Sequence, residues 1–289
     1  MFGQFVINGL ITGVLYSLLS IGFALVYNTT KIFHIAAAAL YVVAAYMFWV
    51  FSSHLGLPFW LGGIISVSIT ILVSVLTEIS VYRPLKMKNS SLNVAMIASI
   101  GVMTVLVNLI AMFFGNETKV ISNEIMKVYT FGDVIITTPQ MMQLVVGSSA
   151  LLIFLFFISK TSLGVRLRAI SCDDSLYCTM GYSTAGTRII VFVISGFFIA
   201  LASCLTVFDI GMDPHMGMNM LINAMVAMII GGVGRFGTCV AGGIILGLLQ
   251  SLVVFQFASN WQNAITFLVL LIFLFFRPQG IAGYKQRTV

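Results

Sequence analysis

The sequence predicts an all-helical polytopic membrane protein with about eight full transmembrane helices and one short or discontinuous helix. Hydrophobic residues make up 60% of the 289 residues and charged residues only 8%, whereas soluble domains carry about 25% charged residues. The apolar residues fall into runs of roughly the 20 residues that cross a bilayer as a helix. The Lys and Arg residues lie unevenly between these runs. This composition excludes a soluble globular enzyme, which could not cover so much apolar surface.

The first span is expected at 5–27, inside a stretch of residues 1–30 that carries no charge. This stretch is too long for the core of a signal peptide and lacks a basic start. The run 219–233 is short for a crossing and ends in a glycine cluster. We expect the whole chain, 1–289, to form a single transmembrane domain. The other full spans are expected at 32–51, 57–77, 92–115, 141–159, 189–208, 238–257 and 261–276.

The basic residues orient the predicted spans, because cytoplasmic loops of membrane proteins are enriched in Lys and Arg. We place the N-terminus outside and count the short run as a crossing. Of the 14 Lys and Arg residues, only Lys119 and Lys127 then face outward, and the C-terminus is cytoplasmic. If the short run did not cross, the N-terminal half would invert and carry the basic cluster at 83–88 outside. The charge bias therefore also predicts that the short run crosses.

Two long connections separate the spans. The outer loop, 116–140, carries three acidic residues and is expected to pack on the outer face. In the polar inner loop, 160–187, Asp173 or Asp174 can cap a short helix and Gly181 can end it. A short capped helix on the cytoplasmic face indicates a docking element. The alternative is an ordinary solvated loop.

Residue types that carry chemistry are scarce in this chain. The four cysteines match no common zinc spacing, and no catalytic triad, carboxylate pair or HExxH pattern occurs. The net charge of +6 does not indicate nucleic-acid binding, because no stripe of Lys and Arg lies on a soluble face. We therefore expect no metal site, no disulfide, no nucleic-acid partner and no enzymatic activity.

Ionisable residues are almost absent from the predicted spans. Glu78 lies at the inner end of the third span and is expected to pair with Arg83. Asp209, Asp213 and His215 are expected in an outer loop. An ion-coupled carrier usually places an acid or a histidine at mid-membrane. The pattern therefore weakens the case for a proton- or sodium-driven mechanism.

Uncharged polar residues are more plentiful within the spans. Taken singly, each is more often a contact between helices than part of a site. Taken together, they indicate a candidate path for a polar uncharged or zwitterionic solute. The candidate path residues are Asn8, Tyr16, Ser20, His34, Asn93, Ser99, Thr104, Asn219 and Asn223.

Glycines cluster in the segments GGVGRFG and AGGIILG. Gly231, Gly232 and Gly234 are expected to unwind a helix, which a membrane tolerates only where the backbone is buried or lines a cavity. Gly243 and Gly247 have the small-xxx-small spacing that lets two helices approach closely. The first segment is not a phosphate-binding loop, because it lacks the Lys-Ser/Thr ending.

Five segments in the same order resemble the integral permease subunit of the branched-chain amino-acid ABC importer family, of the LivH/LivM type. The resemblance covers nearly the whole chain. The chain departs from the family pattern at His34–Ala38, which lacks a second His and a Gly, and at Asn223, where a Lys is common. The resembling segments are NGLITGVLYSLLSIGFALVY (8–27), VYRPLK (81–86), LGVRLRAISCDDSLYCTMGY (163–182), IIGGVGRFGTCVAGGIILGLLQSL (229–252) and FRPQGIAG (276–283).

The resemblance implies half of a translocation path for branched-chain or other amino acids, urea or short amides, in a bacterial cytoplasmic (inner) membrane. It implies a paralogous permease subunit or a second copy as partner, with an extracytoplasmic substrate-binding protein. Two cytoplasmic ATPase subunits would bind ATP and Mg, so that this chain holds no cofactor. Arg168 would reach an acidic partner and Asp173 would cap the docking helix. The implied ATPase-coupling residues are Gly164, Arg166, Arg168, Ala169, Asp173, Asp174 and Gly181.

Two other functions remain as alternatives from the residues alone. The first is an ion-coupled secondary carrier for a small polar solute, which needs an ion site that the sequence does not display. The second is a scaffold membrane protein, which has no need of a capped docking loop together with glycine-broken helices.

Overall fold

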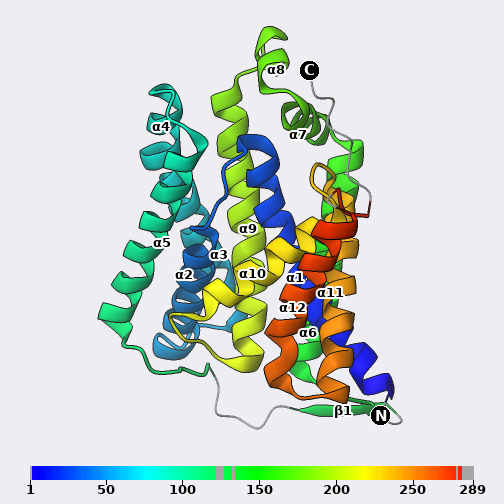
Figure 1. The fold of residues 1–289 in the computed structure, drawn as a ribbon. Helices are drawn as coiled ribbons and strands as arrows, with labels where there is room; N and C mark the ends of the chain where they lie inside the picture. The colour runs from blue at the N-terminus through cyan, green and yellow to red at the C-terminus, as the bar shows by residue number, and fades with distance from the viewer. Residues whose placement is uncertain (1, 122–126, 132–133, 278, 282–289) are drawn as a thin grey trace.

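The computed structural model describes residues 2–121, 127–131, 134–277 and 279–281 as a helical bundle with one small hairpin (Figure 1). The predicted fold class is confirmed, because the described residues contain eight helical segments long and apolar enough to cross a membrane. A shorter apolar helix, Met216–Gly231, follows the sixth of them. The segments are Gly3–Thr30, Ala37–His54, Phe59–Met87, Leu92–Phe114, Thr138–Lys160, Thr184–Ile210, Phe236–Gln256 and Ser259–Phe276.

The elements alternate between long helices and short pieces at their ends. Part of the predicted outer loop lies outside the described residues, as do Pro278 and the last two residues of the FRPQGIAG motif, 282–283. In chain order the elements are α1 (Phe2–Thr30), α2 (Ala37–Trp49), the π-helix η1 (Val50–His54), α3 (Phe59–Thr77), the π-helix η2 (Glu78–Tyr82), α4 (Arg83–Met87), α5 (Leu92–Phe114), β1 (Val128–Phe131), β2 (Val134–Thr137), α6 (Thr138–Lys160), α7 (Ser162–Cys172), α8 (Asp174–Thr179), α9 (Thr184–Ile210), α10 (Met216–Gly231), α11 (Phe236–Gln256), the 3-10 helix η3 (Ser259–Trp261) and α12 (Gln262–Phe276).

The centre of the bundle is a close crossing of α1 and α11. A Cβ added to Gly243 would meet the backbone of Ser17, and one added to Gly247 would meet the backbone of Gly13. Small residues let helix backbones approach in this way, so that van der Waals contact replaces lipid contact. The Ser17 hydroxyl adds a hydrogen bond of 2.9 Å to the Val240 carbonyl. Around this crossing, 89% of an 18-residue window of α1 is buried.

The molecule has two distinct ends, which we call the hairpin end and the α7–α8 end (Figure 1). At the hairpin end, the Gln4 amide exchanges hydrogen bonds of 2.8 and 2.7 Å with the backbone of Ile135 on β2. At the other end, the Lys31 ammonium donates to the Ser171 carbonyl of α7 at 3.2 Å. The start of α1 and the end of α12 therefore lie at opposite ends of the bundle (Figure 1).

Three boundaries differ from the sequence prediction. α1 ends where Lys31 takes a positive φ of 58°, and the second helix begins only at Ala37, so residues 31–36 form a non-helical connection. The 160–187 loop contains two helices, α7 and α8, instead of one. Asp209 lies in the last turn of α9 rather than in a loop, because the helix continues to Ile210 and stops at Gly211.

α10 is the short apolar run of the sequence. It ends at Gly231, and Gly232 and Gly234 take positive φ values of 103° and 101°. Such values are accessible to glycine at little cost, so the chain can reverse there and enter α11. A Cβ on Gly231 would collide with the backbone of Thr238. The turn is closed from the other side by a hydrogen bond of 2.9 Å from the Ile281 amide to the Ile230 carbonyl.

Candidate translocation groove and docking end

α5 stands at the edge of the bundle and packs with one face on α2 (Figure 1). Only 17% of an 18-residue window of this helix is buried. Its exposed surface carries Asn93, Gly101, Thr104 and Asn108 at helical spacing. Polar side chains are costly against lipid tails, so membrane helices usually turn them toward protein or toward a water-filled cavity. This face of α5 is therefore expected to meet another subunit or an aqueous path.

A cavity of about 180 Å³ lies beside this face, between α2, α5 and the start of α10. We call it the α5–α10 groove. Thr104 and Asn108 line it from α5, and His215 and Gly217 line it from the start of α10. Gly217 lets α10 approach α2, because a Cβ there would collide with the Ala38 carbonyl. The groove thus combines polar side chains with close backbone packing.

The Thr104 and Asn108 side chains are held along their own helix. The Thr104 hydroxyl donates to the Ile100 carbonyl at 3.0 Å, and the Asn108 amide donates to the Thr104 carbonyl at 2.8 Å. Each side chain thereby keeps lone pairs for a partner or a solute outside the chain. Neither residue ties α5 to a neighbouring helix through these bonds.

The structure separates the predicted path residues into three groups. Thr104 lines the α5–α10 groove, and Asn93 and Asn219 are exposed on α5 and α10. Asn8 and Tyr16 line a different cavity, which is described below. Ser20, His34, Ser99 and Asn223 are buried inside the bundle.

Tyr16 and Asn223 belong to a buried polar network that joins α1, α10, α11 and α12. The Tyr16 hydroxyl donates to Gln250 Oε1 at 2.8 Å and accepts from Asn223 Nδ2 at 3.2 Å. The Gln250 amide donates to Asn223 Oδ1 at 3.2 Å and to the Thr266 hydroxyl. Buried polar groups of this kind stabilise helix contacts when every member is paired.

His34 and Ser99 belong to a second network, centred on Tyr82 of η2. His34 Nδ1 lies 2.8 Å from the Tyr82 hydroxyl, which donates to Ser99 Oγ at 2.8 Å. Ser99 also accepts the Ala36 amide at 2.9 Å. This network ties α5 to η2 and to the connection after α1. It fixes the face of α5 that is opposite to the exposed one.

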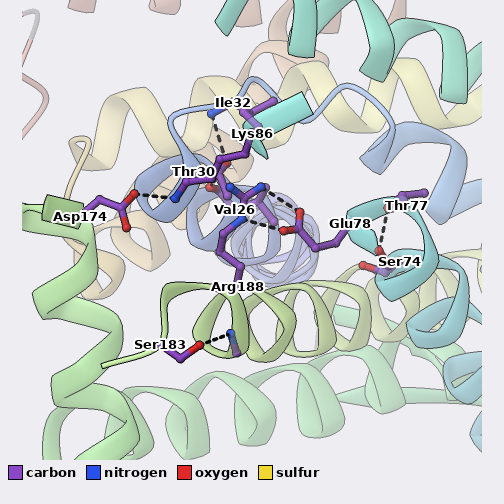
Figure 2. Close-up of polar contacts among 11 residues, drawn as sticks. Val26, Thr30, Ile32, Ser74, Thr77, Glu78, Lys86, Asp174, Ser183 and Arg188 are labelled. Atoms are coloured by element: carbon purple, nitrogen blue, oxygen red, sulfur yellow. Dashed lines mark hydrogen bonds and ion pairs between the residues drawn. The ribbon is translucent and has the colours of Figure 1, made fainter. Parts of the chain in front are cut away.

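The α7–α8 end holds two ion pairs, which Figure 2 shows side by side. Arg188, near the start of α9, places Nε 2.7 Å from Glu78 Oε1 and donates from Nη2 to Oε2 at 3.0 Å. Their side chains are 5% and 3% exposed. The predicted pairing of Glu78 with Arg83 was therefore wrong. Lys86 of α4 pairs with Asp174 of α8 at 2.6 Å, and both side chains are exposed.

α7 carries most of the predicted coupling residues. The Thr161 hydroxyl caps its N-terminus by accepting the Gly164 amide at 3.1 Å. A Cβ on Gly164 would meet the last carbonyls of α6, so glycine permits the tight turn between α6 and α7. Arg166, Arg168 and Ala169 are exposed, which presents a basic surface at this end of the molecule. Arg166 also lies over the Tyr182 ring at 5.0 Å.

α8 is a short helix with the two boundaries that its residues indicate. Asp173 Oδ1 accepts the Leu176 amide at 3.1 Å, and Gly181 follows the helix with a φ of 83°. The Tyr177 hydroxyl lies 2.9 Å from the Thr187 hydroxyl and fixes α8 against the start of α9. Nearby, partial burial lowers the pKa of the Lys31 ammonium.

Sequence reasoning missed Arg188, Gln250, Thr266 and Gln143 as partners in buried contacts. Gln143, Gln250 and Thr266 are isolated polar residues inside apolar runs, and Arg188 directly precedes such a run. That isolation was the available signal. An isolated polar residue in an apolar run indicates a buried polar group. It does not identify the partner of that group, because each partner lies on another helix.

Comparisons with known proteins agree with this architecture. The family model for the permease component of branched-chain amino acid transport systems matches residues 5–274. The permease BraD of Pseudomonas aeruginosa, of a high-affinity branched-chain amino acid transport system, is 26% identical, over 98% of this chain and 96% of BraD. LivH of Salmonella typhimurium is 26% identical, over 99% and 96% of the two chains. A probable LivH of Methanocaldococcus jannaschii is 24% identical, over 94% and 90%.

One solved structure has a similar fold. It is PsaBC from Streptococcus pneumoniae in complex with Fab, with a TM-score of 0.52 and 16% sequence identity. The match covers 96% of this chain and 97% of the other. At this level of identity the likeness concerns the arrangement of the helices.

Proposed function

Because this chain belongs to the family of branched-chain amino acid transport system permease components, we propose that it forms half of the translocation path of an ATP-driven amino-acid importer. As a member of that family it is a multi-pass membrane translocation subunit and not an enzyme, and the ATPase is a separate subunit. The names of its relatives support branched-chain amino acids as the solute class.

The exposed polar face of α5 carries this proposal. A second permease subunit, either a paralogue or another copy, would cover Asn93, Thr104 and Asn108 and close the α5–α10 groove into a path. The groove offers hydroxyl, amide and imidazole groups without a carboxylate, which suits a zwitterionic solute that needs hydrogen bonds but no fixed counter-charge. Solute would pass between the subunits as they rock against each other.

The α7–α8 end is the proposed docking surface for the cytoplasmic ATPases. Basic residues gather at this end, and the positive-inside rule therefore supports a cytoplasmic position for it. The hairpin end would then face outward, toward a substrate-binding protein. The exposed Arg166 and Arg168 on α7 fit an acidic groove on the ATPase. Basic residues at this end are Lys31, Arg83, Lys86, Lys88, Lys160, Arg166, Arg168, Arg188, Arg235 and Arg277.

A chain of contacts leads from this docking surface to the groove. The Lys86–Asp174 pair joins α8 to α4. α4 continues from η2, whose Tyr82 bonds to Ser99 on α5. π-helical turns are frequent at functional sites, since they offset the helix register. We infer that a shift of α8 moves α4 and η2 as one body and thereby tilts α5.

Affinity purification from native membranes in mild detergent tests this function. We expect stoichiometric recovery of an ATPase and a second permease with the tagged chain, and ATP-driven leucine uptake after reconstitution with the binding protein. Arg168→Glu should lose most of the ATPase, because it puts a negative charge opposite an acidic groove. Lys119→Glu, at the hairpin end, is the matched control and should retain it.

Two outcomes would overturn the proposal. Recovery of the chain alone, active in uptake driven by an ion gradient, would identify a secondary carrier. Equal recovery of the ATPase with Arg168→Glu and with the wild type would show that α7 is not part of the docking surface. A folded state for each variant is checked by its elution profile and thermal midpoint.

A further inference from the structure

A second polar cavity lies inside this chain, apart from the α5–α10 groove. It is a partly open cavity with a volume of about 310 Å³, lined by residues of α1, α6, α9, α10 and α12, toward the hairpin end. We call it the Asp209 cavity. The polar residues that line it include Asn8, Thr12, Gln140, Gln143, Thr206 and Asp209. The transport path proposed above makes no use of it.

Asp209 gives this cavity a negative potential. Its carboxylate lies in the last turn of α9, where the helix dipole is negative and disfavours an anion. Among the residues that the structure describes, no Lys or Arg lines the cavity or pairs with Asp209. The backbone of Lys119 pairs with that of Met212, which is near Asp209. The Lys119 ammonium, however, lies over the Trp49 ring, 4.4 Å from its centre. The Gln143 side chain hydrogen-bonds to the Asp209 carboxyl but brings no positive charge, so a cation would balance this half-buried carboxylate.

Two hydroxyls that line the cavity have already donated their protons within the chain, whereas the lining amides of Asn8 and Gln140 also bring NH2 donors. The Thr12 hydroxyl donates its proton to the Asn8 carbonyl at 2.9 Å, and the Thr206 hydroxyl donates to the Ala202 carbonyl at 2.8 Å. Since each hydroxyl has one proton, only lone pairs remain for a guest.

Gln143 adds another acceptor. Its side chain is 1% exposed, and its Nε2 donates to the Leu205 carbonyl at 2.9 Å. Its Oε1 has no hydrogen-bond partner within the described part of the chain. A buried amide oxygen without a partner is costly and rare, and because Gln143 also hydrogen-bonds to Asp209, this oxygen belongs to a side chain that adjoins the carboxyl.

We propose that the Asp209 cavity binds a monovalent cation, either an alkali ion or a primary ammonium group. The Asp209 carboxylate would supply the charge, and Gln143 and Thr206 would supply neutral oxygens. A single carboxylate suits one positive charge, whereas calcium sites usually collect several carboxylates. The site does not depend on the proposed transport function, because all of its groups come from this chain.

Thermal unfolding of the purified full chain in lipid nanodiscs tests the site. Sodium, potassium and methylammonium chloride are titrated separately, with N-methylglucamine chloride keeping the ionic strength constant. We expect at least one of the three cations to raise the melting temperature by roughly 3 °C at ten times its Kd. Asp209→Asn should abolish this shift. Glu117→Gln removes an exposed carboxylate outside the cavity and should keep it.

The pattern of response identifies the source of the charge. A shift with sodium or potassium assigns an alkali ion, and a shift with methylammonium alone assigns an ammonium group. The absence of any shift in the wild type, or an equal shift in Asp209→Asn, overturns the proposal. If Asp209→Asn does not fold, Thr206→Val keeps the side-chain volume and is expected to raise the Kd about tenfold, the loss of roughly one hydrogen bond. An unchanged Kd in that variant also overturns the site.

Discussion

α1 and α5 are both long apolar helices, yet their surroundings differ completely. In α1, 89% of an 18-residue window is buried, and in α5 only 17% is. Both helices carry glycines and uncharged polar residues. The difference lies in which residues pack against the two helices. The glycines of α1 meet the glycines of α11, whereas Gly101 on α5 has nothing within 4 Å.

The polar residues of the two helices differ in the same way. Tyr16 and Ser17 of α1 bond to side chains or carbonyls of other helices. Thr104 and Asn108 of α5 bond to carbonyls of their own helix. Similar residues thus hold a core together in one place and leave a surface open in another. The contrast indicates that α1 serves stability and α5 serves a partner or a solute.

The sharpest test replaces glycine with leucine at the α1–α11 crossing and on the exposed face of α5. Gly247→Leu on α11 pushes a side chain into the backbone of Gly13, so the α1–α11 crossing cannot close. We expect a loss of at least about 3 kcal/mol, beyond ordinary overpacking, which lowers the melting temperature of the purified chain by roughly 6–12 °C. Gly101→Leu on α5 should leave it unchanged or slightly raised. Equal losses in the two variants would show that α5 is packed as tightly as α1.

A smaller effect is expected from removing one hydroxyl from each helix. Tyr16→Phe removes the hydroxyl that bonds to Gln250 Oε1 and Asn223 Nδ2 in a buried network. The expected cost is about 1–3 kcal/mol. Thr104→Val on α5 should stay within about 0.5 kcal/mol of the wild type, as exposed substitutions do. Thermal unfolding of both variants in one detergent compares them, and a larger cost for Thr104→Val would reverse the roles of the helices.

The smallest effect on stability should accompany the largest effect on transport. Asn108→Leu removes an amide from the α5–α10 groove without touching a packed contact. We expect the melting temperature to stay within about 1 °C and ATP-driven leucine uptake to fall several-fold. Phe113→Leu, on another side of the exposed α5 surface, is the matched control. Full uptake by Asn108→Leu would show that Asn108 does not contribute to the path.

The spans and the family were predictable from the sequence because their signals are local. A run of about 20 apolar residues reports a crossing whatever surrounds it. Five ordered segments sufficed for the family. The turn at Gly232 and Gly234 was also predictable, because positive φ values follow from the glycine cluster itself.

The placement of polar residues was not predictable, because it depends on which helices meet. Ser99 and Thr104 lie on one helix, but Ser99 bonds to Tyr82 in the core and Thr104 lines the groove. Both faces of α5 carry polar residues among many apolar ones, so its periodicity does not reveal the packed side. Glu78 was assigned to the basic residue nearest in sequence, whereas its partner, Arg188, comes from the start of α9. Long-range pairing of this kind carries no local pattern.

The crossing of α1 with α11 also has a consequence for biosynthesis. Tyr16 and its partner Gln250 are separated by 234 positions in the chain. At roughly 5–20 residues per second, the ribosome needs on the order of 10–50 s to deliver α11 after α1. During this interval the glycines and hydroxyls of α1 contact lipid or temporary neighbours instead of α11. The newly inserted chain is thus open to quality-control proteases until its seventh long helix arrives, and truncations before α11 should be degraded rather than accumulate.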